Sequence, residues 1–261
     1  MRNLIFIFRY LKYLFKSGNE HSIHSPFVYN LYSQALKPRK QYYTFKEIEL
    51  LRRALINDKR EISYKDYGAG HFKKGNTVRK VSDIARNFSK KPEIAQVLFR
   101  LSCYLAPTYI LELGTSLGIT TSYFAKSQKK CKVISLEGCD ESLDVARENF
   151  RKLKLGNITT IKGNIDITLE ETIKNIPRID LAFFDANHRY EPTINYFNTC
   201  LLKAHEESVF IFDDIYWSAE MVKAWNEIKS HPAVTVSIDL FYFGIVFFRK
   251  AQPKEHFNLR V

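Results

Sequence analysis

Apolar and polar positions follow two different patterns along the chain, and the change lies near residue 106. Before it, apolar residues recur at the three- and four-residue spacing of amphipathic helices, without the alternation typical of strands. This spacing predicts helices over residues 47–56, 80–86 and 92–105. We therefore interpret residues 1–105 as a mainly helical N-terminal extension.

After residue 106, short apolar runs alternate with amphipathic segments. The runs predict strands at 109–113, 132–136, 158–162, 179–184, 208–212, 233–239 and 242–249. Helices are predicted at 118–128, 140–153, 166–175, 190–204 and 217–229. This order is typical of a Rossmann-like, doubly wound α/β domain with a mostly parallel sheet, here over residues 106–261. Because the last two of the seven strands follow each other directly, we expect an antiparallel hairpin at one edge.

The positive charge of the chain is confined to the N-terminal extension. The 261 residues carry a formal net charge of +12. Residues 1–105 hold 21 Lys and Arg against 8 Asp and Glu, a net charge of +13, whereas residues 106–261 hold 19 against 20, a net charge of −1. Such a segment either contacts an anionic partner, such as RNA, a membrane surface or an acidic substrate, or forms a solvated basic surface.

Residues 1–16 combine apolar and cationic positions. Arg9 and Lys12 interrupt the apolar run too early for a membrane-spanning helix, and no small-residue cleavage site follows. A helix here either lies on a membrane surface or packs onto the body of the protein, and we favour packing.

The four cysteines show no Cys-x-x-Cys spacing, and Cys103, Cys131 and Cys200 lie in or beside apolar runs. Thiols in such positions are usually small buried hydrophobic groups, which fits a reducing environment. We therefore expect a cytoplasmic location.

Residues 109–121 contain the most informative motif of the chain. The apolar run ends in Glu112 and Gly114, a turn of small residues follows, and Gly118 opens a predicted helix. A strand, a tight turn and a helix N-terminus bring backbone N–H groups against a ligand. The next apolar run ends in Glu137, whose carboxylate can accept hydrogen bonds from both hydroxyls of a ribose. The pattern predicts a nucleoside site at the carboxyl ends of the strands.

Two other motifs share part of this sequence. Serine at position 116 departs from the dinucleotide pattern Gly-x-Gly-x-x-Gly, so a ligand with a ribose but no diphosphate fits better. Residues 114–118 also spell Gly-x-Ser-x-Gly, the nucleophile turn of α/β-hydrolases, with Ser116 as the nucleophile. A hydrolase would need several βα units before this turn, and it would leave Glu137 without a role.

Carboxylates also end two later strands. Asp185 follows residues 179–184, and Asp213 and Asp214 follow residues 208–212. If these strands are adjacent and parallel, the carboxylates lie side by side with no compensating lysine between them, which favours a hard divalent cation. The alternative is that each aspartate caps the helix that follows. His188 would then be a base, a ligand, a substrate contact or a surface histidine.

These motifs together resemble class I S-adenosylmethionine-dependent methyltransferases, close to the catechol O-methyltransferase-like group and related small-molecule methyltransferases of bacteria. Residues 112–118 match the first glycine motif of the family, Glu137 its ribose-binding acid, and residues 185–190 the motif after its fourth strand. Asp213 and Asp214 fall where metal-dependent members carry Asp-Asn or a pair of acids.

The resemblance implies a cofactor, a site and a reaction. Implied cofactor contacts are Glu112, Gly114, Thr115, Ser116, Gly118, Glu137, Gly138, Gly163, Asn164 and Asp185. Implied catalytic residues are Asp185 and His188, with Mg²⁺ or another divalent cation on Asp185, Asp213 and Asp214. Motifs for adenine N6 and cytosine C5 methylation are absent from the sequence, so we expect O-methylation of a hydroxylated small molecule.

Partners beyond this acceptor stay open at this point. A tRNA- or RNA-modifying methyltransferase that uses the basic N-terminal segment is the alternative function, and a homodimer is compatible with the sequence. We expect residues 1–105 to cap the strand ends, with Tyr42, Tyr43, Phe45 and Tyr67 and the glycines at 68 and 70 closing over a planar acceptor. Deleting residues 1–75 would then abolish methyl transfer but leave cofactor binding.

Overall fold

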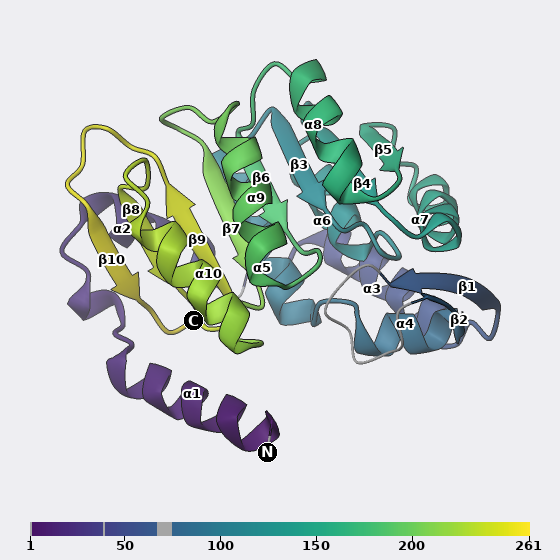
Figure 1. The fold of residues 1–261 in the computed structure, drawn as a ribbon, viewed down its shortest axis with the longest axis horizontal. Helices are drawn as coiled ribbons and strands as arrows, with labels where there is room; N and C mark the ends of the chain where they lie inside the picture. Colours follow the sequence, from purple (N-terminus) through teal and green to yellow (C-terminus); the bar gives the residue numbers. More distant parts are fainter. Residues whose placement is uncertain (1, 39, 67–74) are drawn as a thin grey trace.

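The computed structural model describes residues 2–38, 40–66 and 75–261, which form a three-layer arrangement with one large sheet between two sets of helices (Figure 1). The helices and helical turns are α1 (Arg2–Lys16), η1 (Glu20–Ser22), α2 (Pro26–Leu31), η2 (Tyr32–Leu36), α3 (Tyr43–Ile56), α4 (Val81–Asn87), α5 (Pro92–Leu105), α6 (Ile119–Ser127), α7 (Asp140–Lys152), α8 (Ile165–Asn175), α9 (Tyr190–Leu201) and α10 (Ala219–Ser230). The strands are β1 (Glu61–Asp66), β2 (Gly75–Lys80), β3 (Tyr109–Leu113), β4 (Lys132–Glu137), β5 (Ile158–Lys162), β6 (Leu181–Phe184), β7 (Val209–Asp213), β8 (Val236–Asp239), β9 (Phe243–Phe247) and β10 (Glu255–Asn258). All the predicted helices and strands are present, with ends shifted by a few residues.

The large sheet has the order β10-β8-β9-β7-β6-β3-β4-β5. Its strands are parallel except β9, which is antiparallel to both β7 and β8. The predicted doubly wound, mostly parallel sheet with an antiparallel hairpin is therefore confirmed. The predicted count of seven strands is wrong, because β10 adds an eighth strand that pairs in parallel with β8 at the edge.

Both faces of the sheet are covered, which explains the continuous apolar runs of its strands. Along β7, Val209 and Ile211 enter the core on the side of α5 and α6, whereas Phe210 and Phe212 enter the core on the side of α9 and α10. Successive residues of a strand point to opposite faces, so a strand buried on both faces is apolar at every position.

The N-terminal extension shares these cores. Leu31 of α2 is fully buried in the core on the α5 side of the sheet. Phe45 of α3 packs against Phe99 of α5 and Tyr123 of α6 in a third core. Tyr42 also contacts Phe99, so neither Tyr42 nor Phe45 is available to close over an acceptor. Tyr67 and the glycines at 68 and 70 lie outside the described residues.

The extension is also less purely helical than predicted. Strands β1 and β2 form an antiparallel hairpin beside α7. In β1, Ile62 enters the third core and Tyr64 packs against it, so the hairpin contributes two apolar positions, too short a pattern to predict a strand.

The segment that follows α1 meets the C-terminal end of the chain at the edge strand. The Gly18 N–H donates to the Asn258 carbonyl at 2.8 Å, and the Arg260 N–H donates to the Gly18 carbonyl at 3.0 Å. The hydroxyl of Tyr32 donates to the Arg260 carbonyl at 2.6 Å, and that of Tyr13 donates to the Leu259 carbonyl. These bonds fix the residues that follow α1 to the C-terminal strand.

Helix α1 extends away from the body, and the predicted packing is present on one of its faces only (Figure 1). Phe6, Tyr10 and Tyr13 surround the ring of Phe241, and Arg9 donates to the Tyr216 carbonyl at 2.8 Å. None of the helices in the part of the chain that the structure describes is both long and apolar enough to cross a membrane.

Candidate active site

The turn after β3 lies where the strand order switches, with β4 on one side of β3 and β6 on the other. Gly114 has a φ of +102°, and a Cβ placed on it would lie 2.2 Å from the Asp185 carbonyl oxygen. Gly118 has a φ of +77°, and a Cβ there would press against the Phe150 ring. Both positions therefore require glycine, and the turn leaves bare backbone at the carboxyl end of the sheet.

Glu137 is held rigidly at the end of β4. Its carboxylate accepts hydrogen bonds from the Ser116 N–H at 2.7 Å and from the Cys139 N–H at 2.8 Å. Burial raises the pKa of Glu137, and these backbone donors act in the opposite direction. A hydrogen bond thus joins the predicted ribose acid directly to the glycine turn. Gly138 lies in the short connection between β4 and α7.

Glu112 and Thr115 lie beneath the turn and not in an open site. Glu112 is fully buried, and its carboxyl group accepts from Ser135 Oγ at 2.6 Å and Thr121 Oγ1 at 2.5 Å. Burial raises its pKa to about 8. The Thr115 hydroxyl pairs with Ser135 Oγ at 2.5 Å. These side chains fasten the turn to β4 and α6.

Gly163 and Asn164 form the turn between β5 and α8. Gly163 has a φ of +134°, and its N–H donates to the Glu137 carbonyl at 2.9 Å. Asn164 caps α8 by accepting from the Asp166 N–H at 3.1 Å. The two residues, which the resemblance implies as cofactor contacts, therefore adjoin the end of β4.

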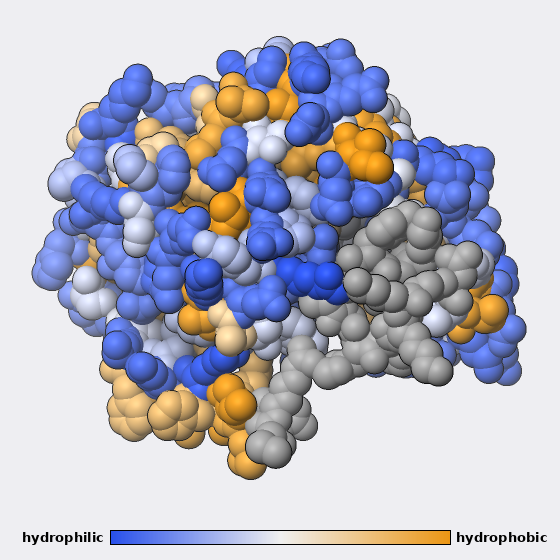
Figure 2. All heavy atoms as spheres, viewed as in Figure 1, coloured by the Kyte–Doolittle hydropathy of each residue, from blue (hydrophilic) through white to orange (hydrophobic). Residues whose placement is uncertain are grey.

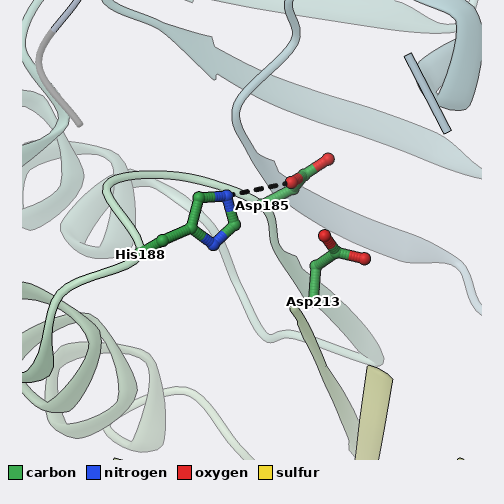
Figure 3. Close-up of side chains that lie close together, drawn as sticks. All are labelled: Asp185, His188 and Asp213. Carbon is green, nitrogen blue, oxygen red and sulfur yellow. Dashed lines mark ion pairs between the residues drawn. The ribbon is translucent and has the colours of Figure 1, made fainter. Parts of the chain in front are cut away.

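Asp185 and Asp213 end the neighbouring parallel strands β6 and β7, as the sequence predicts. Together with His188 they bring one ligand atom each within 4.8 Å of one another (Figure 3). His188 Nε2 lies 3.5 Å from Asp185 Oδ1. Asp214, the third predicted metal ligand, follows in a left-handed conformation and does not belong to this group.

A lysine that the sequence analysis missed lies between the two aspartates. Lys90, in the connection between α4 and α5, places its Nζ 2.9 Å from Asp185 Oδ1 and in contact with Asp213 Oδ2. Its side chain is 14% exposed, and those of Asp185 and Asp213 are 16% and 3% exposed. The assumption that no lysine compensates these carboxylates is therefore wrong.

The buried charges of this group influence one another. Burial alone would lower the pKa of Lys90, but the charges of Asp185, Asp213 and Asp214 raise it well above its ordinary value. Burial would raise the pKa of Asp185, but Lys90 and His188 hold it below the ordinary value. For Asp213, burial and the neighbouring charge of Asp214 raise the pKa despite Lys90. The three aspartates thus favour the charged form of Lys90 in this site.

Comparison with known proteins identifies this arrangement. Residues 111–215 match the model of a family described as a methyltransferase domain. Residues 111–215 form a methyltransferase domain. The match begins in β3 and includes the glycine turn, Glu137, Asp185 and Asp213. The match agrees with the methyltransferase resemblance of the motifs.

One curated relative is an uncharacterized protein of Acanthamoeba polyphaga mimivirus, 29% identical over 133 residues, which are 46% of this chain and 58% of the relative. The chain thus spans a little over half the length of the curated relative it matches.

Solved methyltransferases share the fold at low sequence identity. An SAH-bound methyltransferase of Podospora anserina has a TM-score of 0.61 and 15% identity, over 87% of this chain and 97% of that one. An O-methyltransferase of Bacillus cereus in complex with SAH has a TM-score of 0.56 and 18% identity, over 84% and 96% of the two chains. The parts of this chain that these structures cover are larger than residues 106–261 alone. The shared fold therefore includes part of the N-terminal extension.

Within the methyltransferase domain, the predicted divalent cation does not fit the residues present. The spacing of Asp185, His188 and Asp213 would accommodate an ion. The Lys90 ammonium, however, already lies on both carboxylates and supplies a positive charge at that place. A divalent cation would have to displace a buried, ion-paired lysine, which leaves its charge without a partner.

Neither Ser116 nor Tyr190 has a catalytic setting among the described residues. Ser116 Oγ is buried and has no hydrogen-bond partner among residues 2–38, 40–66 and 75–261, so no histidine activates it as a hydrolase nucleophile. Tyr190 points to α10, where its hydroxyl donates to Glu227 at 2.5 Å and Lys223 lies over its ring. It is therefore not part of the site.

Proposed function

We propose that this protein transfers a methyl group from S-adenosylmethionine to a hydroxyl oxygen of a small molecule. The observation that carries the proposal is the Glu137 carboxylate, which the Ser116 and Cys139 N–H groups hold beside the Gly114–Gly118 turn. A carboxylate fixed in this way can recognise a ribose, and position 116 is serine where a dinucleotide-binding turn has its second glycine.

The residues around the turn fit a nucleoside ligand. Glu137 would hold the ribose, and the Gly163–Asn164 turn lies where the base would extend. Ser116 Oγ and Asn187 Oδ1 are buried without a hydrogen-bond partner among the described residues. Buried polar atoms nearly always have a partner, and a bound ligand would supply it.

The chemistry divides between the two parts of the site. When bound, S-adenosylmethionine supplies an electrophilic methyl group that an acceptor oxygen attacks in line. His188 would accept the proton of the acceptor hydroxyl as its oxygen takes the methyl group. Asp185, 3.5 Å from His188 Nε2, orients the ring for this transfer. The enzyme thus contributes alignment and a deprotonated acceptor.

Isothermal titration calorimetry tests the cofactor assignment. We expect micromolar affinity for S-adenosylmethionine, and a loss of at least about tenfold in Glu137→Ala, because the ribose hydroxyls lose their acceptor. Glu170→Ala, at an exposed position of α8, is the matched control and is expected to bind normally. Tight binding of a nicotinamide dinucleotide without binding of S-adenosylmethionine would contradict the proposal.

The acceptor class is tested with the methyl-labelled cofactor on catechols, other hydroxylated aromatics and bulk tRNA. We expect turnover of a hydroxylated small molecule with little dependence on salt. The RNA alternative is motivated by the net charge of +13 on residues 1–105. Labelling of tRNA that falls steeply with salt would favour this alternative. The shared fold with an O-methyltransferase of Bacillus cereus supports an oxygen as the methyl acceptor.

A further inference from the structure

We propose that the Lys90 ammonium is a built-in substitute for a divalent cation, so that methyl transfer in this protein needs no metal. The part of the inference that concerns cation binding stands without the proposed function. The part that concerns the acceptor rests on it.

The first argument is the position of the charge. Lys90 Nζ contacts Asp185 Oδ1 and Asp213 Oδ2, the same carboxylates that, with His188, could hold an ion. The two aspartates end adjacent parallel strands, so their spacing is set by the sheet and not by flexible loops. A divalent cation on these two carboxylates would therefore compete with the ammonium for the same oxygens.

The second argument is how Lys90 is delivered. The residue precedes α5, which begins at Pro92 and packs along α6 through its buried residues. Lys91, its neighbour, is exposed to solvent. The fold therefore directs one lysine of the pair into the carboxylate group, although burying a lysine is costly unless it is paired. The ion pairs with Asp185 and Asp213 provide that pairing.

The third argument is what the ammonium can still do. An ammonium has three N–H donors, and two of them are directed at Asp185 and Asp213. The remaining donor can orient an acceptor oxygen and stabilise its negative charge as the proton leaves. Lys90 would then do the work that a metal does in other sites, namely to fix and polarise the acceptor.

Binding of Mn²⁺ to the full chain, followed by electron paramagnetic resonance, tests the first part without any turnover. We expect no specific binding to the wild type and one bound ion in Lys90→Met, in which the carboxylates are left without their cation. Lys90→Arg keeps the charge and is expected to exclude the ion, as is the control Lys91→Met. Normal S-adenosylmethionine binding would show that each variant is folded.

Specific Mn²⁺ binding to the wild type that is lost in Asp213→Asn would overturn the inference, because Lys90 would then yield to the metal. Failure of a folded Lys90→Met to gain an ion would also overturn it. If Mn²⁺ behaves as expected but no methyl acceptor is ever found, the proposed function fails and the cation inference remains.

Turnover tests the second part. Wild-type activity is expected to be unchanged by a chelator, whereas Lys90→Met is expected to lose about a hundredfold in kcat. The KM for S-adenosylmethionine should stay the same, and Lys90→Arg should restore part of kcat. A purely structural role of Lys90 would instead lower the melting temperature and affect both parameters. Loss of wild-type activity on chelation, with recovery on adding Mg²⁺, would refute a metal-free reaction.

A second inference comes from α1 and is independent of Lys90. The face of α1 opposite Phe241 is apolar and exposed, with Leu4 70%, Ile7 52%, Phe8 69%, Leu11 47% and Phe15 91% exposed. These residues recur every three or four positions and so form one stripe along the helix. Figure 2 shows apolar side chains gathered at the lower end of the molecule, where α1 extends from the body in Figure 1.

We infer that α1 docks on an anionic lipid surface. The helix carries four cationic residues and no acidic one, and Lys12 and Lys16 are exposed at its side. Two copies of α1 packed face to face would bring like charges together, whereas anionic headgroups would pair with them. The rigid attachment of the other face through Arg9 and Tyr13 keeps the apolar stripe directed outward.

Co-sedimentation with vesicles tests this inference. The full chain is expected to bind phosphatidylcholine vesicles that contain phosphatidylglycerol, and to bind pure phosphatidylcholine weakly. Phe15→Glu should abolish binding, and Leu202→Glu, which introduces the same charge at an exposed apolar position of the body, should not. Equal sedimentation of the Phe15→Glu variant would overturn the inference. A dimer in solution that Phe15→Glu dissociates would overturn it in favour of a second copy.

Discussion

Left-handed backbone conformations gather where strands end at the active site. Ser116, Asn187, His188 and Asp214 have φ values of 49°, 65°, 45° and 53°. Each such non-glycine residue costs about 1–3 kcal/mol, so the surrounding structure must hold it in place. The residues follow β3, β6 and β7 directly. The strained turns therefore coincide with the segments that would contact cofactor and acceptor.

Gly114 provides the sharpest test of this geometry. In Gly114→Ala the new Cβ would meet the Asp185 carbonyl, and the φ of +102° would be strained in any case. We expect the free energy of unfolding to fall by roughly 2 kcal/mol or more in urea denaturation. S-adenosylmethionine binding should weaken at the same time. Gly156→Ala, where a Cβ meets nothing within 4 Å, is the control, and equal stability of the two variants would contradict the expectation.

Glu112 gives the protein a pH dependence with a definite sign. Its pKa of about 8 in the folded state lies above its ordinary value of 4.5 because the carboxyl group is buried. The folded state therefore holds a proton that the unfolded state releases, and stability falls as the pH rises between these two values. Below about pH 4 Glu112 makes its full contribution to the free energy of unfolding, and above about pH 8 this contribution is lost.

Glu112→Gln tests this assignment, because the amide stays neutral at every pH. We expect the variant to gain stability relative to the wild type as the pH rises from about 5 to about 8, by a few kcal/mol. Urea denaturation across this range measures the difference. A difference that does not change with pH would show that Glu112 is ionised in the folded protein.

At the scale of elements, the sequence predicts the strands that are buried on both faces of the large sheet. The strands β3, β4, β6 and β7 are mostly apolar and buried, and their order with the intervening helices predicts the parallel sheet. The hairpin β1–β2 and the edge strand β10 escape prediction for the opposite reason. Their residues are largely half-buried or exposed, so tertiary contacts, such as those of Gly18 with β10, decide their conformation.

The same limit explains why the sequence predicts one half of the site and not the other. Glu137, Asp185 and Asp213 were identifiable because each directly ends an apolar run. Lys90 has no such signal, since Lys91 beside it has the same charge and a similar environment in the sequence. Only the packing of α5 along α6 places one of the two lysines at the strand ends. The metal prediction therefore did not take Lys90 into account.

At the scale of the whole molecule, the N-terminal extension and the methyltransferase domain fold as one body. Leu31 of α2 shares a core with β-strand residues such as Ile110 and Val209. Phe45 of α3 shares another with Tyr123 of α6. Deleting residues 1–75 would expose one face of the sheet, so we now expect loss of the fold and not the selective loss of turnover that the sequence suggested.

Leu31→Ala tests this unity, because both tryptophans of the chain, Trp217 and Trp225, lie in the methyltransferase part. Removing the fully buried Leu31 side chain should cost about 2–5 kcal/mol. In one cooperative body, the unfolding midpoint followed by tryptophan fluorescence falls together with that followed by circular dichroism. The control Leu50→Ala, 54% exposed on α3, should leave both midpoints in place. A fluorescence midpoint unchanged in Leu31→Ala, with a lowered dichroism midpoint, would mean that residues 1–105 unfold on their own.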